Sequence, residues 1–313
     1  MLLELPSTFR RPDLNDAGKE IEMACDWIEA SVLFSSEPIS ALTVGDFLIE
    51  SQWFSDQEDS GVFVDEVWSR LRARREERGA SAAFDFDYQA IRMTASNWDE
   101  SPSYVFCLLL SYARHHLKWS RKITWNYNEQ GAIFEALTAV ALESIFPDWT
   151  VHQTGWSEST PSHLEKVVTE VAGRLCGQVK NLERWNRRQA KEQGLDILCY
   201  REFSDGRGSF PSFFVQCASG RNFEEKLSDP HMGVWNDLLS LTPACLARKA
   251  FASPFMFSRR EFDQHTIKSE GFFLDGQRLL TATSREQGRL NSALSNRVAR
   301  WAKPLISKLP WSR

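Results

Sequence analysis

Two stretches near the middle of the chain are apolar at nearly every position, and their pattern predicts two β-strands. Residues 195–200 (LDILCY) and 213–218 (FFVQCA) would place successive side chains on opposite faces of a strand. Between them, Asp205-Gly206 is a strong turn dipeptide. Residues 222–226 (NFEEK) then resemble a capping box, which predicts a short helix that carries Lys226.

One polar side chain interrupts each of these strands. Asp196 and Gln216 each stand alone among apolar residues, and a carboxylate in such a strand is costly to bury unless it is paired, hydrogen-bonded or bound to a metal. On the same face of a hairpin the two side chains would satisfy each other. The alternative is that Asp196 closes a turn after Gly194 while Gln216 bonds a neighbouring backbone group.

The first part of the chain has helical periodicity, from Leu14 to about Leu117. Residues near one face of the first helix are Ile21, Cys25, Ile28 and Val32. Further helices are expected at 46–49, 62–74 and 104–117. The mixed-charge run at 71–79 (LRARREERG) is interpreted as a solvated helix face, with a phosphate-binding edge as the alternative.

A strongly apolar helix is predicted for residues 131–146 (GAIFEALTAVALESIF). Apolar residues cover nearly its whole circumference, so the helix should be buried. Glu135 lies near its start, where it would face inward or complement the positive end of the helix. Residues 149–153 (WTVHQ) predict a strand that ends at Thr154-Gly155, and a polar helix is expected over 161–192. Its basic residues are Lys166, Arg174, Lys180, Arg184, Arg187, Arg188 and Lys191, mostly solvent-facing, with phosphate contact by a minority as the alternative.

Two later segments are expected to extend the sheet. Residues 244–257 (ACLARKAFASPFMF) predict a strand followed by a loop. Residues 271–283 (GFFLDGQRLLTAT) predict a hairpin around Asp275-Gly276, because that dipeptide favours a tight turn.

Charge is unevenly spread along the chain. The net charge of −5 argues against a generally basic nucleic-acid coat. The tail from 285 to 313 nevertheless carries seven basic residues against Glu286, with Trp301 and Trp311 interleaved. It is interpreted as an amphipathic C-terminal helix docked by its tryptophans, with a nucleic-acid surface as the alternative.

Composition places the chain among ordinary globular proteins, with 313 residues, 42% of them apolar and 25% charged, enough for one large domain or two smaller ones. Twelve Trp and 21 Phe residues predict an aromatic core. We expect a cytoplasmic protein, because no apolar run reaches the length of a membrane span and Pro6 and charges interrupt any signal-peptide pattern. The six scattered cysteines contain no CxxC pair and are expected to be reduced.

The order of these elements resembles the core of the PD-(D/E)XK nuclease superfamily, the restriction-endonuclease-like fold, and within it the Mrr-type branch. In that branch a GxxFE-type helix precedes a strand with a Thr-Gly-like end, then a Gly-x-Asp strand and a strand in which Gln replaces the second acidic residue. The matching residues are Gly131, Phe134, Glu135, Thr154, Gly155, Gly194, Asp196 and Gln216. The resemblance covers roughly residues 128–227, about a third of the chain.

The resemblance implies an α/β (α+β) fold with a central mixed β-sheet flanked by helices. We expect a helical N-terminal region at 1–120, a restriction-endonuclease-like core with a sheet extension at 121–284, and a basic C-terminal helix or tail at 285–313. Nucleic acid, DNA rather than RNA, is the implied partner, with a companion protein or a second copy of the chain and no membrane. A restriction or anti-phage defence system is the implied setting.

The resemblance also implies a Mg²⁺ or Mn²⁺ site for phosphodiester hydrolysis. Its ligands would be Glu135, Asp196, Gln216 and the backbone carbonyl of Cys217, which are hard oxygen donors. The chain departs from the family at the usual lysine position, which is Ala218. Lys226, on the following helix, is the predicted replacement, with Lys180 as a weaker substitute. The implied catalytic residues are therefore Glu135, Asp196, Gln216 and Lys226. Loss of catalysis, leaving a subunit that binds nucleic acid or a partner protein, is the alternative. A metal-free hydrolase is not indicated, because the sequence has no GxSxG, P-loop or HExxH motif.

Overall fold

The computed structural model describes residues 1–9, 17–79, 82–88, 90–154, 164–185, 194–241, 247–285 and 288–312. The elements of the first half, in chain order, are α1 (Gly18–Ser35), β1 (Ile39–Ser40), α2 (Ala41–Glu50), α3 (Gln57–Arg78), β2 (Phe84–Asp87), β3 (Ala90–Met93), the 3₁₀ helix η2 (Trp98–Glu100), α4 (Pro102–His115), α5 (Leu117–Ser120) and α6 (Tyr127–Ile145). Those of the second half are β4 (Thr150–Gln153), α7 (Leu164–Arg174), β5 (Gln178–Val179), α8 (Leu182–Trp185), β6 (Ile197–Tyr200), β7 (Ser212–Cys217), the 3₁₀ helix η3 (Phe223–Lys226), α9 (Met232–Leu238), β8 (Leu239–Ser240), β9 (Ala247–Ala252), α10 (Arg259–Ser269), β10 (Phe272–Leu274), α11 (Gly276–Thr283) and α12 (Ser292–Ile306).

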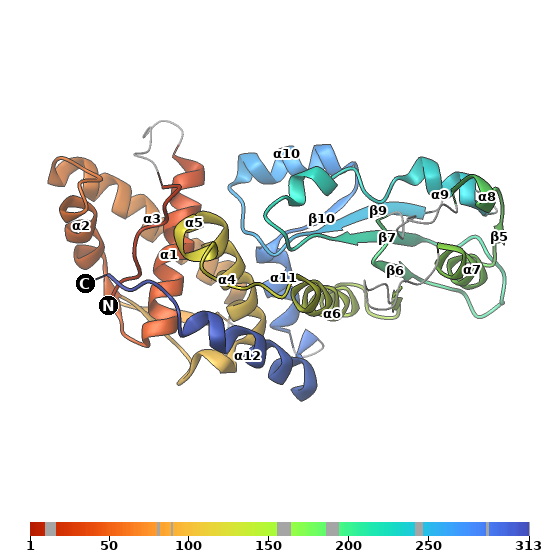
Figure 1. Ribbon diagram of the computed structural model, residues 1–313. Helices are drawn as coiled ribbons and strands as arrows, with labels where there is room; N and C mark the ends of the chain where they lie inside the picture. Colours follow the sequence, from red (N-terminus) through yellow and green to blue (C-terminus); the bar gives the residue numbers. More distant parts are fainter. Residues whose placement is uncertain are drawn as a thin grey trace.

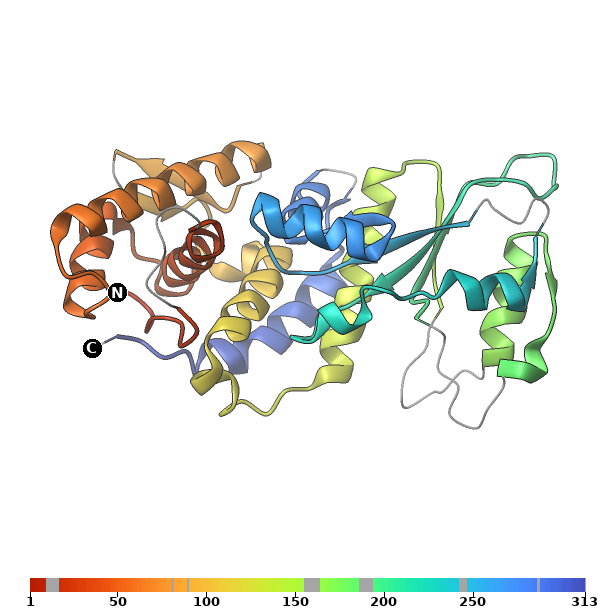
Figure 2. The ribbon, with the colours of Figure 1, turned by 90° about the horizontal axis from the view of Figure 1, so that it is seen from above.

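The molecule is elongated, with α1, α2 and α3 at one end and the large sheet toward the other (Figures 1 and 2). The last helix, α12, runs back along the molecule, so that the two ends of the chain lie together. A β-bridge between Leu3 and Trp311 joins them. None of the described helices is long and apolar enough to cross a membrane.

The N-terminal part is mostly helical, as expected, but it also holds a small antiparallel sheet that the sequence analysis missed. The strand order is β1-β3-β2, and Ile91 pairs with both Ile39 and Phe86. These strands are two to four residues long. Alternation over so few residues gives only a weak signal against the strong helical pattern on either side.

The central sheet is mixed, which confirms the predicted fold class. Its strand order is β10-β9-β7-β6-β4. β6 pairs antiparallel with both β4 and β7, whereas β9 pairs in parallel with both β7 and β10. The predicted pair of strands around Asp205-Gly206 is therefore confirmed as β6 and β7.

Alternation in the strands divides their side chains between two apolar layers. Ile197 and Val215 face the larger core, which also contains residues of α1, α4, α6, α11 and α12. Leu198 and Phe214 face a smaller core formed with α7 and α9. The larger core includes residues from Leu2 to Leu309, so the three segments predicted as separate regions share it.

One predicted helix is wrong in outline. The helix expected over 161–192 is interrupted after α7, where Cys176 has a φ of +52° and the chain turns into β5. Residues 186–193, with Arg187, Arg188 and Lys191, lie outside the described residues, as do 155–163 with Gly155.

The hairpin expected at 271–283 is a strand followed by a helix. The side chain of Asp275 caps α11 by accepting a hydrogen bond of 2.9 Å from the backbone N–H of Arg278. β10 pairs in parallel with β9, and the described residues that follow it form α11 instead of a second strand. Asp-Gly is thus a helix start here, because Asp is also a favoured N-cap residue. The strand predicted within 244–257 is confirmed as β9, although residues 242–246 lie outside the described chain.

The mixed-charge run at 71–79 was expected on a solvated face, and this is wrong for Arg74 and Arg78, which are buried. Both arginines bind acidic side chains of α1. The Arg74 contacts are Nη2 to Glu22 Oε2 at 2.5 Å, Nη1 to Asp26 Oδ1 at 2.8 Å and Nη1 to Glu29 Oε2 at 2.8 Å, and Arg78 Nη1 contacts Glu29 Oε1 at 3.1 Å. We call these five residues the buried charge cluster.

The buried charge cluster keeps its arginines charged. Burial opposes the charged form of Arg74, but the carboxylates of α1 outweigh this effect and raise the pKa of its guanidinium. Burial raises the pKa of Asp26 to about 6, against the effect of Arg74. For Glu29, Arg78 and Arg74 overcome the effect of burial, so the pKa of that carboxyl is lowered. The charged side chains between α1 and α3 are therefore stabilised by ion pairs with one another and not by water.

Candidate functional site

The polar residues of the predicted site come from four elements that meet at the start of β6 and the end of β7, two interior strands of the central sheet. Glu135 lies on α6, whose first turn is capped by the side chain of Asn126. Asp196 directly precedes β6, Gln216 is the next-to-last residue of β7, and Lys226 is the last residue of η3. Antiparallel pairing of Ile197 with Val215 brings the flanking Asp196 and Gln216 opposite each other, as the sequence predicted.

These residues line one cavity of about 370 Å³. The predicted residues in its wall are Glu135, Asp196, Gln216, Cys217 and Lys226. Asp196 and Gln216 are buried, Glu135 is half-buried and Lys226 is exposed at the rim. Lys180, the weaker lysine candidate, donates its backbone N–H to the carbonyl of Leu238 and does not line this cavity.

The carboxylate of Asp196 is fixed by two short hydrogen bonds. Its Oδ2 accepts one of 2.6 Å from Gln216 Nε2 and one of 2.6 Å from the backbone N–H of Cys217. Gln216 Nε2 also donates to the carbonyl oxygen of Cys217, at 3.0 Å. A single amide nitrogen therefore bridges two predicted oxygen ligands. Gln216 thus satisfies Asp196, as the first interpretation predicted, and also bonds a neighbouring backbone group, which is the part of the alternative that concerned Gln216.

Gly194 makes this arrangement possible. Its φ is +71°, a conformation that side-chain-bearing residues rarely adopt, and a Cβ at this position would lie 2.8 Å from Gln216 Oε1 and 2.6 Å from Asp229 Cβ. Thr154 supports the neighbouring backbone, because its Oγ1 donates to the carbonyl of Leu195 at 2.9 Å. The Gly-x-Asp pattern thus has a local steric reason.

The charged groups of the site affect the pKa of the buried Cys217 thiol. Burial raises the pKa of Cys217, and the carboxylates of Asp196 and Glu135 raise it further. Lys226 acts in the opposite direction. The thiol therefore stays protonated, and the acidic groups, not the sulfur, dominate the electrostatics of the cavity.

The cavity also contains residues that the sequence analysis did not select. Gln130 is buried and donates from Nε2 to the carbonyl and Oγ of Ser219, at 2.9 and 3.1 Å. Tyr127 and Asn222 line the opening. Gln130 stands directly before Gly131 of the helix motif, which is the only sequence signal for it. Its hydrogen bonds join α6 to the chain after β7, and so fix one wall of the cavity.

The position at which the resemblance predicts a lysine carries no charge. Ala218 is buried, and its backbone N–H donates to the carbonyl of Ala252 at 2.9 Å. No group of three His, Cys, Asp or Glu side chains that could hold a metal was found in the part of the chain that the structure describes. A cation here would therefore depend on an amide and a carbonyl oxygen in addition to the two carboxylates.

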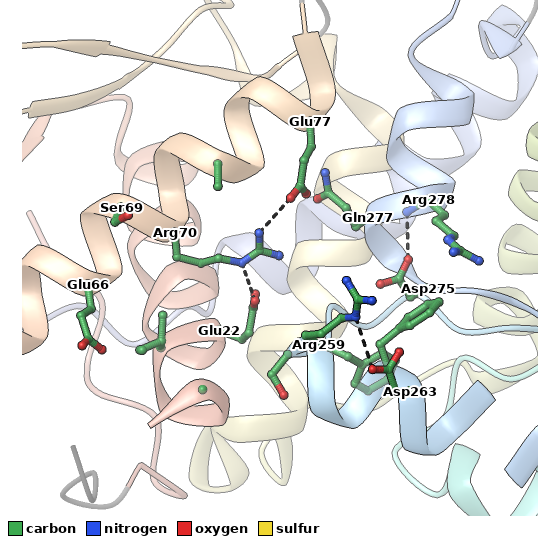
Figure 3. Close-up of a pocket in the computed structure, with 16 residues that line it drawn as sticks. Glu22, Glu66, Ser69, Arg70, Glu77, Arg259, Asp263, Asp275, Gln277 and Arg278 are labelled. Atoms are coloured by element: carbon green, nitrogen blue, oxygen red, sulfur yellow. Dashed lines mark hydrogen bonds and ion pairs between the residues drawn. The ribbon is translucent and has the colours of Figure 1, made fainter. Parts of the chain in front are cut away.

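A larger cavity, of about 790 Å³, lies between α3 and the segment from α10 to α11 (Figure 3). Its charges largely pair with one another. Arg70 contacts Glu22 at 2.5 Å and Glu77 at 3.0 Å, and Arg259 contacts Asp263 at 3.3 Å. This mutual pairing makes it a weaker candidate than the cavity that holds Asp196.

Comparison of the chain with protein-family models, with curated proteins and with solved structures found no match.

Proposed function

We propose that this protein is a Mg²⁺-dependent nuclease that hydrolyses DNA phosphodiester bonds. The observation that carries the proposal is the meeting of Glu135, Asp196, Gln216 and Lys226, which are spread over some ninety positions of the sequence, in the wall of one cavity. Their order along the chain is the order in the restriction-endonuclease-like core that the sequence resembles. A restriction or phage-defence setting and a cytoplasmic location belong to the same proposal.

The donor set fits a hard cation. Asp196 Oδ2 and the Cys217 carbonyl oxygen both approach Gln216 Nε2, at 2.6 and 3.0 Å. The oxygen and nitrogen of an amide group have nearly the same shape, so a half-turn of the Gln216 amide presents Oε1 in the place of Nε2. Asp196, Gln216, Cys217 and Glu135 would then supply oxygen ligands, which Mg²⁺ prefers to sulfur or nitrogen.

The chain's own groups have separable roles in this proposal. When bound, the ion would supply a Lewis acid for the scissile phosphate and lower the pKa of a water. Asp196 and Glu135 provide the negative charge that holds it, and Gly194 and the Cys217 N–H keep Asp196 in place. Lys226, at the rim, brings an ammonium group toward the phosphate that enters the cavity.

The direct test is incubation of the full-length protein with supercoiled plasmid DNA. We expect nicked and linear products with Mg²⁺ or Mn²⁺ and none with EDTA, because the site depends on a divalent cation. Parallel reactions with single-stranded DNA and with RNA define the substrate class. Cleavage that is equally fast in EDTA would contradict the proposal.

One observation favours a second function, which is binding without cleavage. The position at which the resemblance places a catalytic lysine is Ala218, a buried residue without a charge that lines the cavity. Under this alternative the cavity keeps its shape while the protein acts as a nucleic-acid-binding or partner-binding subunit. Absence of cleavage together with salt-sensitive DNA binding would select it.

Substitution of Lys226 by methionine tests whether this lysine takes the place of the one that is absent at Ala218. If Lys226 replaces the missing lysine, we expect the cleavage rate to fall by about 10²-fold, as for loss of one group that stabilises transition-state charge. Lys180→Met is the matched control, because this exposed lysine lies away from the cavity. Single-turnover rates at saturating enzyme measure the effect. Equal rates for wild type and Lys226→Met would remove this lysine from the mechanism.

A further inference from the structure

Basic residues gather in two segments that contain no acidic residue. The whole chain has 37 Lys and Arg against 42 Asp and Glu, whereas residues 115–126 and 288–312 together hold eight basic residues and no acidic one. The eight are Lys118, Arg121, Lys122, Arg289, Arg297, Arg300, Lys303 and Lys308. These two segments are therefore strongly basic, although the protein as a whole is acidic.

The fold brings these two segments together. Trp301 of α12 packs against Trp125, with ring centroids 6.3 Å apart, and Trp125 packs against Trp119 at 6.0 Å. The apolar side of α12 is buried, including Val298 and Leu305. In both ribbon views α12 lies beside the segment that leads from α5 into α6 (Figures 1 and 2). The tryptophans thus dock the tail, as the sequence predicted, and its basic side chains remain outside.

Most of these basic side chains are exposed. We define the basic face as Lys118, Arg121 and Lys122 of the first segment together with Arg300, Lys303 and Lys308 of the second, all of them exposed. Within the described part of the chain none of the six forms an ion pair, whereas Arg297 is held by Glu129, at 2.7 and 2.8 Å. Six exposed cations on two segments that pack against each other offer a surface for an anionic partner.

The basic face is continuous with the candidate site through the start of α6. Glu129, which binds Arg297, follows Tyr127 and Asn128, and these two residues line the cavity that contains Asp196. Hydrogen bonds from Arg297 lower the pKa of Glu129, and the charge of Arg300 adds to the shift, so the basic face reaches this helix turn. A polyanion lying on the face would lead directly into the cavity.

We propose that the basic face binds the phosphate backbone of duplex DNA and guides it to the cavity beside Tyr127. The inference rests on the proposed function, because the adjoining cavity suits a phosphodiester. An anionic membrane is less suitable, since no large apolar side chain in the described parts of these two segments is among the exposed ones, and an interfacial helix needs such groups to insert.

The test is DNA binding by the full-length protein in EDTA, which separates binding from cleavage. Fluorescence anisotropy with a short labelled duplex would be recorded between roughly 50 and 200 mM salt. For the triple variant Arg300→Glu, Lys303→Glu, Lys308→Glu we expect at least about a tenfold loss of affinity and a salt slope smaller by about 3, because each lost phosphate contact removes about one unit.

The control is a triple variant on α10, Arg259→Glu, Arg260→Glu, Lys268→Glu, which changes net charge equally on the opposite side of the molecule (Figure 1). It should bind DNA as the wild type does. A second variant, Lys118→Glu with Lys122→Glu, tests the other segment in case the α12 variant melts at lower temperature. Equal losses in the α10 and α12 variants would overturn the inference.

The remaining outcomes are equally decisive. Absence of DNA binding by the wild type would also overturn the proposal for the basic face. Binding to phosphatidylserine vesicles but not to DNA would overturn it as well. Binding is measured in EDTA and cleavage in Mg²⁺, so the proposal for the basic face and the nuclease proposal fail independently. DNA binding without cleavage would support the proposal for the basic face and contradict the nuclease proposal. Cleavage that is unaffected by the α12 variant would support the nuclease proposal and contradict the proposal for the basic face.

Discussion

Substitution of Arg74 by methionine is expected to lower the free energy of unfolding by about 3–5 kcal/mol, the range for removal of one partner from a buried ion pair. Arg74 is 0% exposed, and its guanidinium contacts Glu22, Asp26 and Glu29 at 2.5 to 2.8 Å. Methionine fills similar space but leaves these carboxylates buried with only Arg70 and Arg78 nearby. They would have to be protonated or hydrated for the variant to fold.

The loss can be measured by urea denaturation followed by circular dichroism at neutral pH. Arg75→Met is the matched control, because Arg75 is 42% exposed and its contact with Asp85 is 3.4 Å. An exposed pair of this kind contributes only about 0–1 kcal/mol. Lowering the pH should restore part of the stability of Arg74→Met, since protonation neutralises the orphaned carboxylates. Similar unfolding free energies for the two variants would contradict the structural role of Arg74.

Substitution of Asp196 by asparagine is expected to lower the rate of Mg²⁺-dependent DNA cleavage by on the order of 10³-fold. A bound metal supplies several kcal/mol of transition-state stabilisation, and about 1.4 kcal/mol corresponds to a tenfold change in rate. Asparagine keeps the shape of Asp196 and can still accept the hydrogen bond from the Cys217 N–H. The variant removes the charge and leaves the fold in place.

Two measurements make this result specific. Single-turnover cleavage gives the rate, and Mn²⁺ titration followed by electron paramagnetic resonance gives cation affinity without turnover. Asp205→Asn is the control, because Asp205 lies in the exposed turn of the same hairpin, paired with Arg207 at 2.7 Å. If Asp196→Asn cuts DNA as fast as wild type and Asp205→Asn, the nuclease assignment is excluded. Unchanged Mn²⁺ affinity would exclude Asp196 as a ligand.

The central hairpin and its polar residues could be predicted from sequence because local pattern determines them. Alternation assigns Ile197 and Leu198 to opposite layers, and antiparallel pairing then brings Asp196 against Gln216. The glycine at 194 could be linked to the site only by the family resemblance. Its steric role, close to Asp229, depends on a contact between residues 35 positions apart.

Features that depend on distant partners could not be predicted in this way. Arg74 lies in a run of charged residues that is typical of a solvated surface, and its acidic partners are 45 to 52 positions earlier in the chain. Similarly, Asp275-Gly276 favours a turn and a helix start about equally by local chemistry. Parallel pairing of β10 with β9 decides between them, and pairing of this kind has no local signature.

The shared apolar core limits how this chain could be rearranged in evolution. Helices α1, α4, α6, α11 and α12 contribute to it together, and Arg78 reaches across 199 positions to bond Gln277 at 3.0 Å. The segment from 121 to 284 is therefore no portable module that could be grafted into another gene, because excision would strip its sheet of the helices that shield one face. Insertions in loops, which leave this interior whole, are the more accessible path to new specificity.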